Sequence, residues 1–301
     1  METNKVFKSG FIGVIGRPNV GKSTLFNAII GEKISIIVDK PQTTRNKITG
    51  IKNLPDAQLI FLDTPGIHKA KTPLNRAMVQ TARDTFNDAD LLLMLVEANS
   101  AAHPQDIFLI EALAEIRIPV FLVINKIDLI EKQMLLPQID KFRTLYDFKE
   151  IIPVSAVKGD GIDDLIETIK NYLPEGPQYF AEDEFTDASQ RFIAAEFIRE
   201  KIMELTEQEV PYVTAVEVDS FKEVEEKNLI RISATITVEK ESQKAIMIGK
   251  KGAMLKKIGT QARLEMENLF GSKVFLELFV RVKKDWTSSD KMLKEFGLIK
   301  D

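Results

Sequence analysis

A short segment with two glycines separates an apolar run from an amphipathic run near the start of the chain. The segment reads Gly16-Arg17-Pro18-Asn19-Val20-Gly21-Lys22-Ser23 and fits the pattern G-x-x-x-x-G-K-[ST]. The run before it, 11–15, predicts a buried strand, and the run after it, 22–30, predicts a helix that ends at Gly31. Glycines permit a tight turn with inward-pointing N–H groups, and the helix N-terminus adds partial positive charge. The segment therefore predicts a strand–loop–helix unit that binds phosphate.

The bulk composition excludes several classes of protein. At 301 residues the chain is expected to form two domains, and its net charge of −4 argues against binding polyanions over the whole surface. The absence of cysteine excludes disulfides, thiolate zinc sites and cysteine nucleophiles. Residues 1–9 lack the apolar core of a signal peptide and no apolar run is membrane-spanning in length, so we expect a cytoplasmic protein.

Residues 1–173 alternate strand-like apolar runs with helical patterns. The expected strands lie near 11–15, 34–38, 48–53, 58–63, 91–96, 120–124 and 151–154. The expected helices lie near 22–30, 74–87, 104–116, 131–146 and 161–172. This alternation predicts an α/β domain with a mostly parallel, doubly wound sheet, in which ligands bind at the carboxyl ends of the strands.

A cluster of prolines, glycine and acidic residues over 174–187 predicts a linker. Residues 188–301 then follow a different order, with a helix at 189–208, strands near 212–220 and 228–238, helices near 242–248 and 253–269, a strand at 273–282 and a short helix near 286–297. Apolar residues alternate regularly in the last two strands. This order predicts a smaller α+β domain.

The glycine segment and a second motif supply candidate contacts to phosphate and metal. Lys22 can reach the β- and γ-phosphates, and Ser23 can ligate Mg²⁺. In Asp63-Thr64-Pro65-Gly66, after the strand at 58–63, the aspartate can hold the same ion through water and the Gly66 N–H can sense the γ-phosphate. The expected nucleotide and metal contacts are Gly16, Asn19, Val20, Gly21, Lys22, Ser23, Thr24, Asp63 and Gly66.

The motif Asn125-Lys126-Ile127-Asp128, after the strand at 120–124, indicates which base is bound. A carboxylate only accepts hydrogen bonds, and guanine offers Asp128 an N1–H and an exocyclic N2–H₂ together, whereas adenine offers no such pair. A site built on this carboxylate therefore rejects ATP. Asn125 can reach N7, the stem of Lys126 can lie over the ring, and Ser155-Ala156 can direct a backbone N–H toward O6.

The polar segment Pro41-Gln42-Thr43-Thr44-Arg45 lies between the glycine segment and Asp63. A threonine here can close on Mg²⁺ only when the γ-phosphate is present, and its loop would then become ordered. We expect Thr44 to be that ligand, with Thr43 as the second candidate. The alternative interpretation is an ordinary polar surface loop.

A second glycine segment, Gly249-Lys250-Lys251-Gly252, stands between two short predicted helices. Two glycines let such a turn approach the backbone of about four single-stranded nucleotides. Between residues 239 and 263 the chain carries seven basic and two acidic residues, although its net charge is negative. We expect RNA contacts from Ile246, Ile248, Gly249, Lys250, Lys251, Gly252, Lys256 and Lys257. The alternative is a helix-ending glycine flanked by solvated lysines.

Taken in order, the motifs of the first domain resemble those of translation-type GTPases. The sequences G-R-P-N-V-G-K-S, P-Q-T-T-R, D-T-P-G, N-K-I-D and S-A resemble the bacterial Era family closely. The resemblance covers the whole chain, because the second domain is similar to a type II KH domain. It implies hydrolysis of GTP to GDP with Mg²⁺, and binding of single-stranded RNA near the 3′ end of small-subunit ribosomal RNA during maturation of the small ribosomal subunit. It also implies peripheral association with the inner membrane; we expect a monomer that does not bind DNA.

One position departs from the pattern of Ras-like enzymes. Ile67 follows Gly66 where those enzymes carry a glutamine, and because isoleucine cannot orient water we expect slow intrinsic hydrolysis. In related GTPases with this loop, an asparagine that matches Asn19 coordinates K⁺, which can replace an arginine finger. Asn19 either does the same here or only stabilises the turn of the loop. The candidate catalytic residues are Lys22, Asn19 and Thr44.

A second class of function stays open from the sequence. A membrane-associated regulatory GTPase whose C-terminal domain binds protein or anionic lipid would also carry a basic patch. The glycine segment between two helices favours RNA over this alternative.

Overall fold

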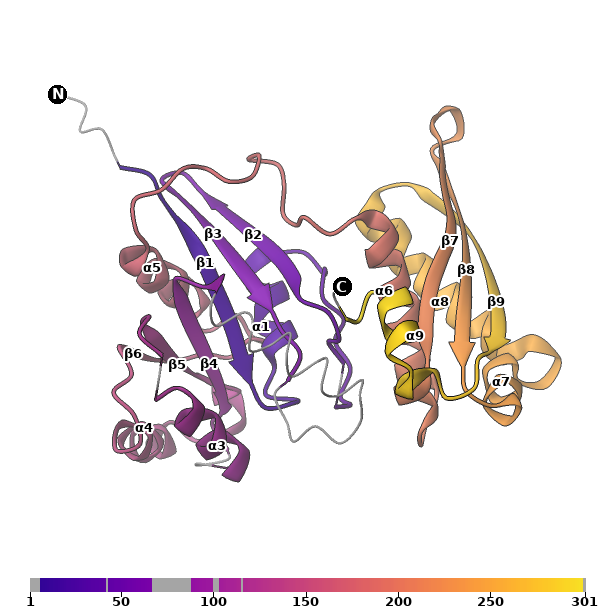
Figure 1. Cartoon of the computed structure of the whole chain (residues 1–301). Coiled ribbons are helices and arrows are strands. Elements are labelled where there is room, and N and C mark those ends of the chain that lie inside the picture. The colour runs from indigo at the N-terminus through magenta and orange to yellow at the C-terminus, as the bar shows by residue number, and fades with distance from the viewer. Residues whose placement is uncertain (1–5, 42, 67–87, 100–102, 115, 300–301) are drawn as a thin grey trace. The chain divides into compact units, whose positions relative to one another are not determined.

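The computed structural model describes residues 6–41, 43–66, 88–99, 103–114 and 116–299, which cluster into two compact units (Figure 1). Of these residues, the first unit contains those up to 35 and those from 44 to 187, and the second contains 36–43 and 188–299. The expected helix at 74–87 lies outside the described residues. Among those described, no helix is both long and apolar enough to cross a membrane.

Six strands of the described residues form the sheet of the first unit. They are β1 (Lys8–Gly16), β2 (Ile48–Leu54), β3 (Ala57–Asp63), β4 (Leu91–Glu97), β5 (Val120–Asn125) and β6 (Glu150–Pro153), in the spatial order β2-β3-β1-β4-β5-β6. All neighbouring strands are parallel except β2 and β3. The chain crosses from one side of β1 to the other between β3 and β4, and such a switch point is where open α/β sheets bind ligands. The predicted fold class is confirmed.

Helices cover both faces of this sheet, as the apolar strands require. Helices α3 (Pro104–Ala112) and α4 (Leu135–Arg143) pack with β4 and β5 around one cluster of buried side chains. Helices α1 (Lys22–Ile30) and α5 (Ile162–Tyr172) contact each other. The residues at 91–96 and 120–124 are all buried. Because β4 and β5 are parallel, the polar residues that follow them lie at the same edge of the sheet.

The strand expected at 34–38 does not form. Ile34 and Ile36 are fully buried, as its apolar alternation suggests, but the backbone pairs with a side chain instead of a strand. The amide of Asn27 in α1 accepts hydrogen bonds from the N–H groups of Ile34 (3.1 Å) and Ser35 (3.0 Å) and donates to the carbonyl of Ser35 (2.6 Å). Because one amide satisfies these backbone groups, the segment is buried without a neighbouring strand.

The segment predicted as a linker is held along the edge of the first unit. The buried side chain of Gln58 accepts hydrogen bonds from the N–H groups of Tyr179 (2.8 Å) and Phe180 (3.0 Å) and donates to the Phe180 carbonyl (2.9 Å). Farther along, the N–H of Ile51 in β2 donates to the carbonyl of Phe185 at 2.9 Å. The exposed edge of β2 is therefore covered by the chain that leads to the second unit.

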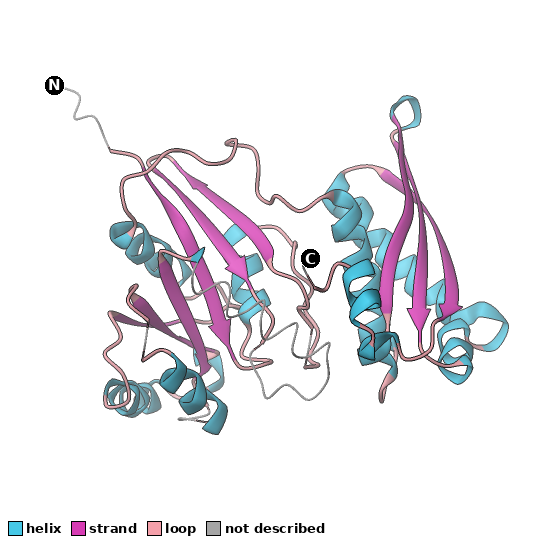
Figure 2. Cartoon of the chain, viewed as in Figure 1, coloured by secondary structure: helices cyan, strands magenta, loops and turns pink. Residues whose placement is uncertain are grey.

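The second unit is a three-stranded sheet with helices on one face (Figure 2). Its elements are α6 (Gln190–Leu205), β7 (Ala215–Val224), β8 (Leu229–Val238), α7 (Glu241–Ile248), α8 (Ala253–Phe270), β9 (Lys273–Val282) and α9 (Asp290–Glu295). Strand β8 is central, antiparallel to β7 and parallel to β9. Helices α6 and α8 contact each other and the sheet, and β7 begins later than expected because Pro211 lies in a 3₁₀ turn.

The short segment 36–43 also belongs to this unit and lies against α6. The N–H of Ile37 donates a 2.8 Å hydrogen bond to the carboxylate of Glu200, which is fully buried. The ammonium of Lys40 donates to the carbonyls of Met203 and Thr206 at the end of the helix. A cation is favourable there because the last carbonyls of a helix carry partial negative charge.

Candidate nucleotide site and RNA-binding loop

The glycine segment at the end of β1 forms a loop around a buried lysine. Gly21 has φ of 94°, and a Cβ there would lie 2.3 Å from Nδ2 of Asn125, so only glycine fits. The ammonium of Lys22 donates to the carbonyls of Gly16 (3.1 Å) and Arg17 (3.0 Å), and no ion pair joins it to a described carboxylate. Burial lowers the pKa of Lys22 to about 8. A cation that is buried in this way is suited to an anionic ligand.

Three hydroxyl groups converge on the carboxylate of Asp63. One carboxylate oxygen, Oδ2, accepts from Ser35 (2.7 Å), Ser23 (2.9 Å) and Thr44 (3.4 Å). The other, Oδ1, is buried and has no hydrogen-bond partner among the residues that the structure describes, and burial raises the pKa of the carboxyl group. A buried oxygen without a partner among hard oxygen donors fits a Mg²⁺ ion, which would be held by the hydroxyls of Ser23 and Thr44 and, through water, by Asp63.

The two threonine candidates differ in position. The hydroxyl of Thr44 lies 3.0 Å from that of Ser23, beside Asp63. The hydroxyl of Thr43 instead donates to the carbonyls of Val38 (3.3 Å) and Lys40 (2.6 Å). The structure thus brings Thr44, the preferred candidate, beside the residues that would hold Mg²⁺. The sequence analysis did not single out Ser35. Its position depends on the hydrogen bonds of the Asn27 amide to the backbone of Ile34 and Ser35, and no sequence motif marks these.

The residues that would bind the base are connected to the phosphate loop. Asn125, which is buried, donates to the carbonyl of Val20 at 2.9 Å and accepts from the N–H of Ala156 at 3.0 Å. Both N–H groups of Ser155-Ala156, one of which was expected to point toward guanine O6, have partners within the protein: that of Ala156 holds Asn125, and that of Ser155 donates to the carbonyl of Asp160 at 2.9 Å. Ser155 donates a 2.6 Å hydrogen bond to Oδ1 of the exposed Asp128, which orients the carboxylate for a base.

An acidic residue at the end of β4 joins the two halves of this site. The carboxylate of Glu97 forms ion pairs with both Arg17 in the phosphate loop and Lys126 in the base motif. The contacts with Lys126 and Arg17 lower the pKa of Glu97 against the opposing effect of burial. Arg17 also lies 3.4 Å from the buried Asp106. No sequence motif marks Glu97, because its partners come from two distant segments.

The structure also gives the conformation, burial and neighbours of the remaining predicted residues of the nucleotide site. Asn19 has φ of 65°, a left-handed conformation that asparagine tolerates, and its carbonyl accepts a 2.8 Å hydrogen bond from Lys126. Val20 is fully buried, and Thr24 lies in the first turn of α1. A Cβ built on Gly66 would lie 3.3 Å from the Lys22 ammonium nitrogen, so the D-T-P-G motif borders the phosphate loop. Ile67 lies outside the described residues.

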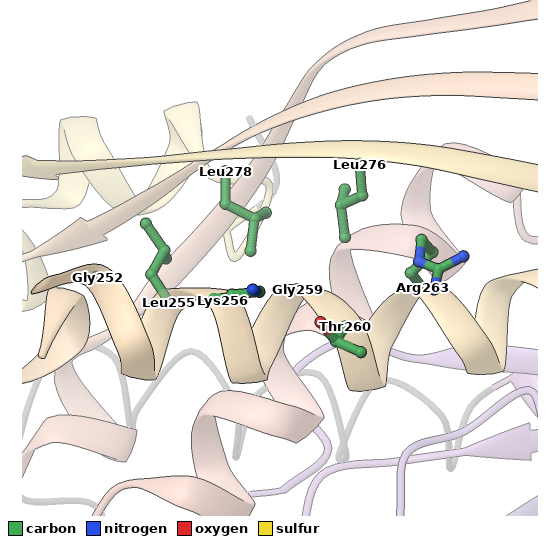
Figure 3. A pocket seen from close by; sticks show the side chains of 8 residues that line it. All are labelled: Gly252, Leu255, Lys256, Gly259, Thr260, Arg263, Leu276 and Leu278. Carbon is green, nitrogen blue, oxygen red and sulfur yellow. The ribbon is translucent and has the colours of Figure 1, made fainter.

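The second glycine segment joins α7 to α8 and borders a groove (Figure 3). Gly249 has φ of 71°, and a Cβ there would come within 2.8 Å of Met254 Cβ. Gly252 has φ of 78° at the N-terminus of α8. Lys250, Lys251, Lys256 and Lys257 are all exposed. The turn therefore presents backbone and cations to solvent, as contact with a sugar–phosphate chain requires.

The groove has a volume of about 370 Å³ and lies between α8 and β9. Its lining residues are Gly252, Leu255, Lys256, Gly259, Thr260, Arg263, Leu276 and Leu278. Figure 3 shows Leu276 and Leu278 pointing from β9 toward the helix. Gly252 and Lys256 were predicted, whereas Ile246 and Ile248 are not among the lining residues. Leu276 and Leu278 could have been found from the alternation of β9, which places them on its helix-facing side.

Comparison with known proteins identifies the family of each unit. Residues 11–126 match the family described as 50S ribosome-binding GTPase, and residues 209–287 match the KH domain family. The chain is 63% identical to GTPase Era of Syntrophus aciditrophicus over 292 residues, which cover 97% of this chain and 95% of that protein. It is 59% identical to GTPase Era of Geobacter metallireducens, covering 97% and 98% of the two chains.

This chain belongs to the Era family of GTPases. Crystal structures support the assignment over its full length: Aquifex aeolicus Era bound to GDP and aluminium fluoride has 42% identity, a TM-score of 0.94 and coverage of 98% of this chain and 100% of that one. A structure of Era with MgGDPNP and nucleotides 1506–1542 of 16S ribosomal RNA has the same identity, TM-score and coverage. The predicted family and the order of a GTPase domain before a KH domain are confirmed.

Proposed function

We propose that the chain is a guanine-nucleotide switch that binds single-stranded RNA near the 3′ end of 16S ribosomal RNA and assists maturation of the small ribosomal subunit. The observation that carries this function is the groove beside Gly249–Gly252, which combines a glycine turn, exposed lysines and an apolar floor in a chain that also has a GTPase site. Era in complex with 16S ribosomal RNA nucleotides supports the proposal. It would act as a monomer in the cytoplasm.

In the GTPase site, each group has one task. Lys22 would supply positive charge for the β- and γ-phosphates, and Ser23, Thr44 and Asp63 would hold Mg²⁺, which when bound would neutralise charge on these phosphates. Asp128, oriented by Ser155, selects guanine. Asn125 fixes the loop relative to the base motif through Val20.

Thr44 is the residue through which the γ-phosphate would act on the rest of the chain. Its hydroxyl reaches the metal-binding residues, and it directly follows the segment 36–43. Once the γ-phosphate has left, the interaction that would hold Thr44 near Ser23 is lost, and the loop before Thr44 would be released. Hydrolysis would in this way time the release of RNA.

The RNA function is tested by anisotropy of a fluorescein-labelled single-stranded RNA that carries the 3′-terminal sequence of 16S ribosomal RNA. We expect affinity that falls steeply with salt and is lost in Lys250→Asp/Lys251→Asp, which leaves both glycines in place. The matched control is Lys132→Asp/Lys141→Asp on the first unit. RNA affinity that is equal in the two double variants would contradict the groove as the binding site.

Vesicles of anionic lipid added in the same assay test the alternative, a membrane-associated GTPase. Binding to vesicles without binding to RNA would favour that alternative.

We also propose that intrinsic turnover is slow and depends on K⁺ coordinated by Asn19. Asn19 lies in the phosphate loop beside Lys126, where a cation near the β–γ bridge would complement the charge of the transition state. GTP hydrolysis should be faster in K⁺ than in Na⁺, and Asn19→Ala should abolish the difference. Equal turnover in the two salts would restrict Asn19 to shaping the turn.

A further inference from the structure

The face of the second sheet that turns away from α8 carries exposed aromatic side chains and two exposed cations, Lys222 and Arg231. Along β9, side chains alternate, so that Leu276 and Leu278 face the groove and Phe275 and Phe279 face the opposite side. Phe275 is 48% exposed and Phe279 is 55% exposed. A buried core does not account for two such phenylalanines on one strand.

Phe275 is part of a row that crosses all three strands. The strand register places Lys222 of β7 opposite Arg231 of β8, and Arg231 opposite Phe275 of β9. All three are exposed, and the guanidinium carbon of Arg231 lies 5.7 Å from the centre of the Phe275 ring. Neither Lys222 nor Arg231 forms an ion pair with any carboxylate that the structure describes. The row therefore combines an exposed ring, a guanidinium that lies over that ring, and a second exposed cation, and no described carboxylate neutralises either charge.

The chemistry of this row matches a nucleotide of single-stranded RNA. Bases stack on aromatic rings and on guanidinium planes, and neighbouring cations neutralise phosphates. A charged protein partner would find cations here as well, but an exposed aromatic ring combined with an arginine is typical of surfaces on which bases of single strands stack. The carboxylate of Glu277, on the same face of β9, separates this row from Phe279.

The row also lies next to the groove of the proposed RNA site. Strand β9 is at the edge of the sheet, and its two faces border the groove and the row, respectively. In Figure 1, β9 lies beside β8 on one side only. An RNA strand that leaves the groove around this edge passes from Leu276 to the neighbouring Phe275.

We propose that Lys222, Arg231 and Phe275 form a second RNA-contacting surface, which stacks a base of single-stranded RNA that extends beyond the groove. The inference rests on the proposed RNA function, because the groove supplies the first attachment. It predicts that only RNA longer than the groove uses the row. The groove of such a domain holds about four nucleotides.

The test measures anisotropy of two labelled oligonucleotides of mixed A and C sequence, about five and about twelve nucleotides long, with the full chain and a non-hydrolysable GTP analogue. Phe275→Ala and Arg231→Glu should weaken binding of the long RNA about fivefold or more and leave the short RNA unchanged. Phe275→Tyr should bind like the unmodified chain, because tyrosine also stacks. The controls are Phe108→Ala and Lys132→Glu, exposed residues of the first unit.

Two results would overturn the platform. One is long-RNA affinity of Phe275→Ala and Arg231→Glu that matches the unmodified chain, as expected if this face binds a protein. The other is an equal loss for both lengths, which would indicate an effect on the groove. If the unmodified chain binds neither RNA, the proposed RNA function itself fails, whereas substitutions that change the affinity for both RNAs by the same factor, or for neither, contradict only the platform.

Discussion

The protonation of Lys22 should depend on whether an anionic ligand lies beside its ammonium group. Burial holds the pKa of Lys22 at about 8 without an anion, below its ordinary value of 10.5. A phosphate beside it restores the protonated form. Near pH 8 the empty site is about half protonated and the occupied site is fully protonated, so GDP binding should take up about half a proton.

Calorimetry of GDP binding at pH 8, in buffers with different ionisation enthalpies, measures that uptake. The variant Lys22→Arg, if it still binds, should take up almost none, because arginine stays charged. Since the folded-state pKa of Lys22 is lowered, the empty protein should also gain stability as the pH rises from about 8 toward 10.5. A nucleotide-binding reaction without proton uptake at pH 8 would contradict the lowered pKa of Lys22.

The carboxylate of Asp128 should decide which base is bound. Asp128→Asn exchanges an acceptor for a group that also donates, and the new amide can donate to O2 of xanthine. We expect GDP affinity to fall about a hundredfold and XDP affinity to rise. Competition titrations with the two nucleotides measure the switch, and a variant that keeps its preference for GDP would remove Asp128 from base recognition.

Glu97 should act on nucleotide affinity through its two cationic partners. Glu97→Gln removes the charge that holds Arg17 and Lys126 together, and losing such a bond costs about 1.5 kcal/mol, or about tenfold in the Kd of GDP. Glu111→Gln, on the exposed side of α3, is the matched control. Stopped-flow measurement should show faster GDP release in Glu97→Gln alone. Equal release rates in the two variants would count against a positioning role.

Among the structural elements, the segment after α1 shows where sequence patterns stop being informative. The alternating apolar residues at 34–38 are buried as a strand would be, yet the partner of their backbone is the amide of Asn27. Periodicity reports burial, and it does not report which group satisfies the backbone. Ser35 and Glu97 could not be predicted either, because their partners come from distant parts of the sequence. Lys22, Asp63 and Asp128 could be predicted, because each belongs to a short sequence motif.

Asn27 should therefore be important for the stability of the first unit. Asn27→Ala leaves two backbone N–H groups without their acceptor, which should lower the free energy of unfolding by about 2–4 kcal/mol. Asn27→Asp keeps the acceptor oxygen and loses only the bond to the Ser35 carbonyl, so its loss should be smaller. Urea denaturation followed by circular dichroism gives the free energy of unfolding of both variants. An equal loss in the two would mean that the hydrogen bonds from the Ile34 and Ser35 N–H groups to Asn27 do not account for the stability.

The second unit shows a different division between pattern and structure. The alternation along β8 and β9 predicted both strands; the apolar face of β8 is buried, whereas that of β9 is mostly half-buried. The groove could not be assigned from sequence in the same way, because it combines α8 with one face of β9, which are consecutive in the chain but paired only by folding. Ile246 and Ile248 do not line this groove, whose apolar side chains are Leu255, Leu276 and Leu278, and the predicted contact of the two isoleucines with RNA stays a prediction.

For the molecule as a whole, the account joins a guanine-nucleotide site in one unit to an RNA groove in the other. The motifs place both sites in one chain, and the family assignment covers both. If the two sites are coupled, RNA affinity should differ between the GTP-bound and the GDP-bound protein. A nucleotide can shift a conformational equilibrium only by as much as its affinities for the two conformations differ.

The most direct test compares the affinity of the full chain for the 3′-terminal 16S ribosomal RNA sequence in the presence of Mg²⁺ with GDPNP and with GDP. We expect tighter RNA binding with GDPNP, by about fivefold or more. The difference should disappear in Thr44→Ala, which removes the hydroxyl beside Ser23 and leaves the RNA groove untouched. RNA affinity that is the same in both nucleotide states of the unmodified chain would contradict the account of this protein as a GTP-controlled RNA-binding switch.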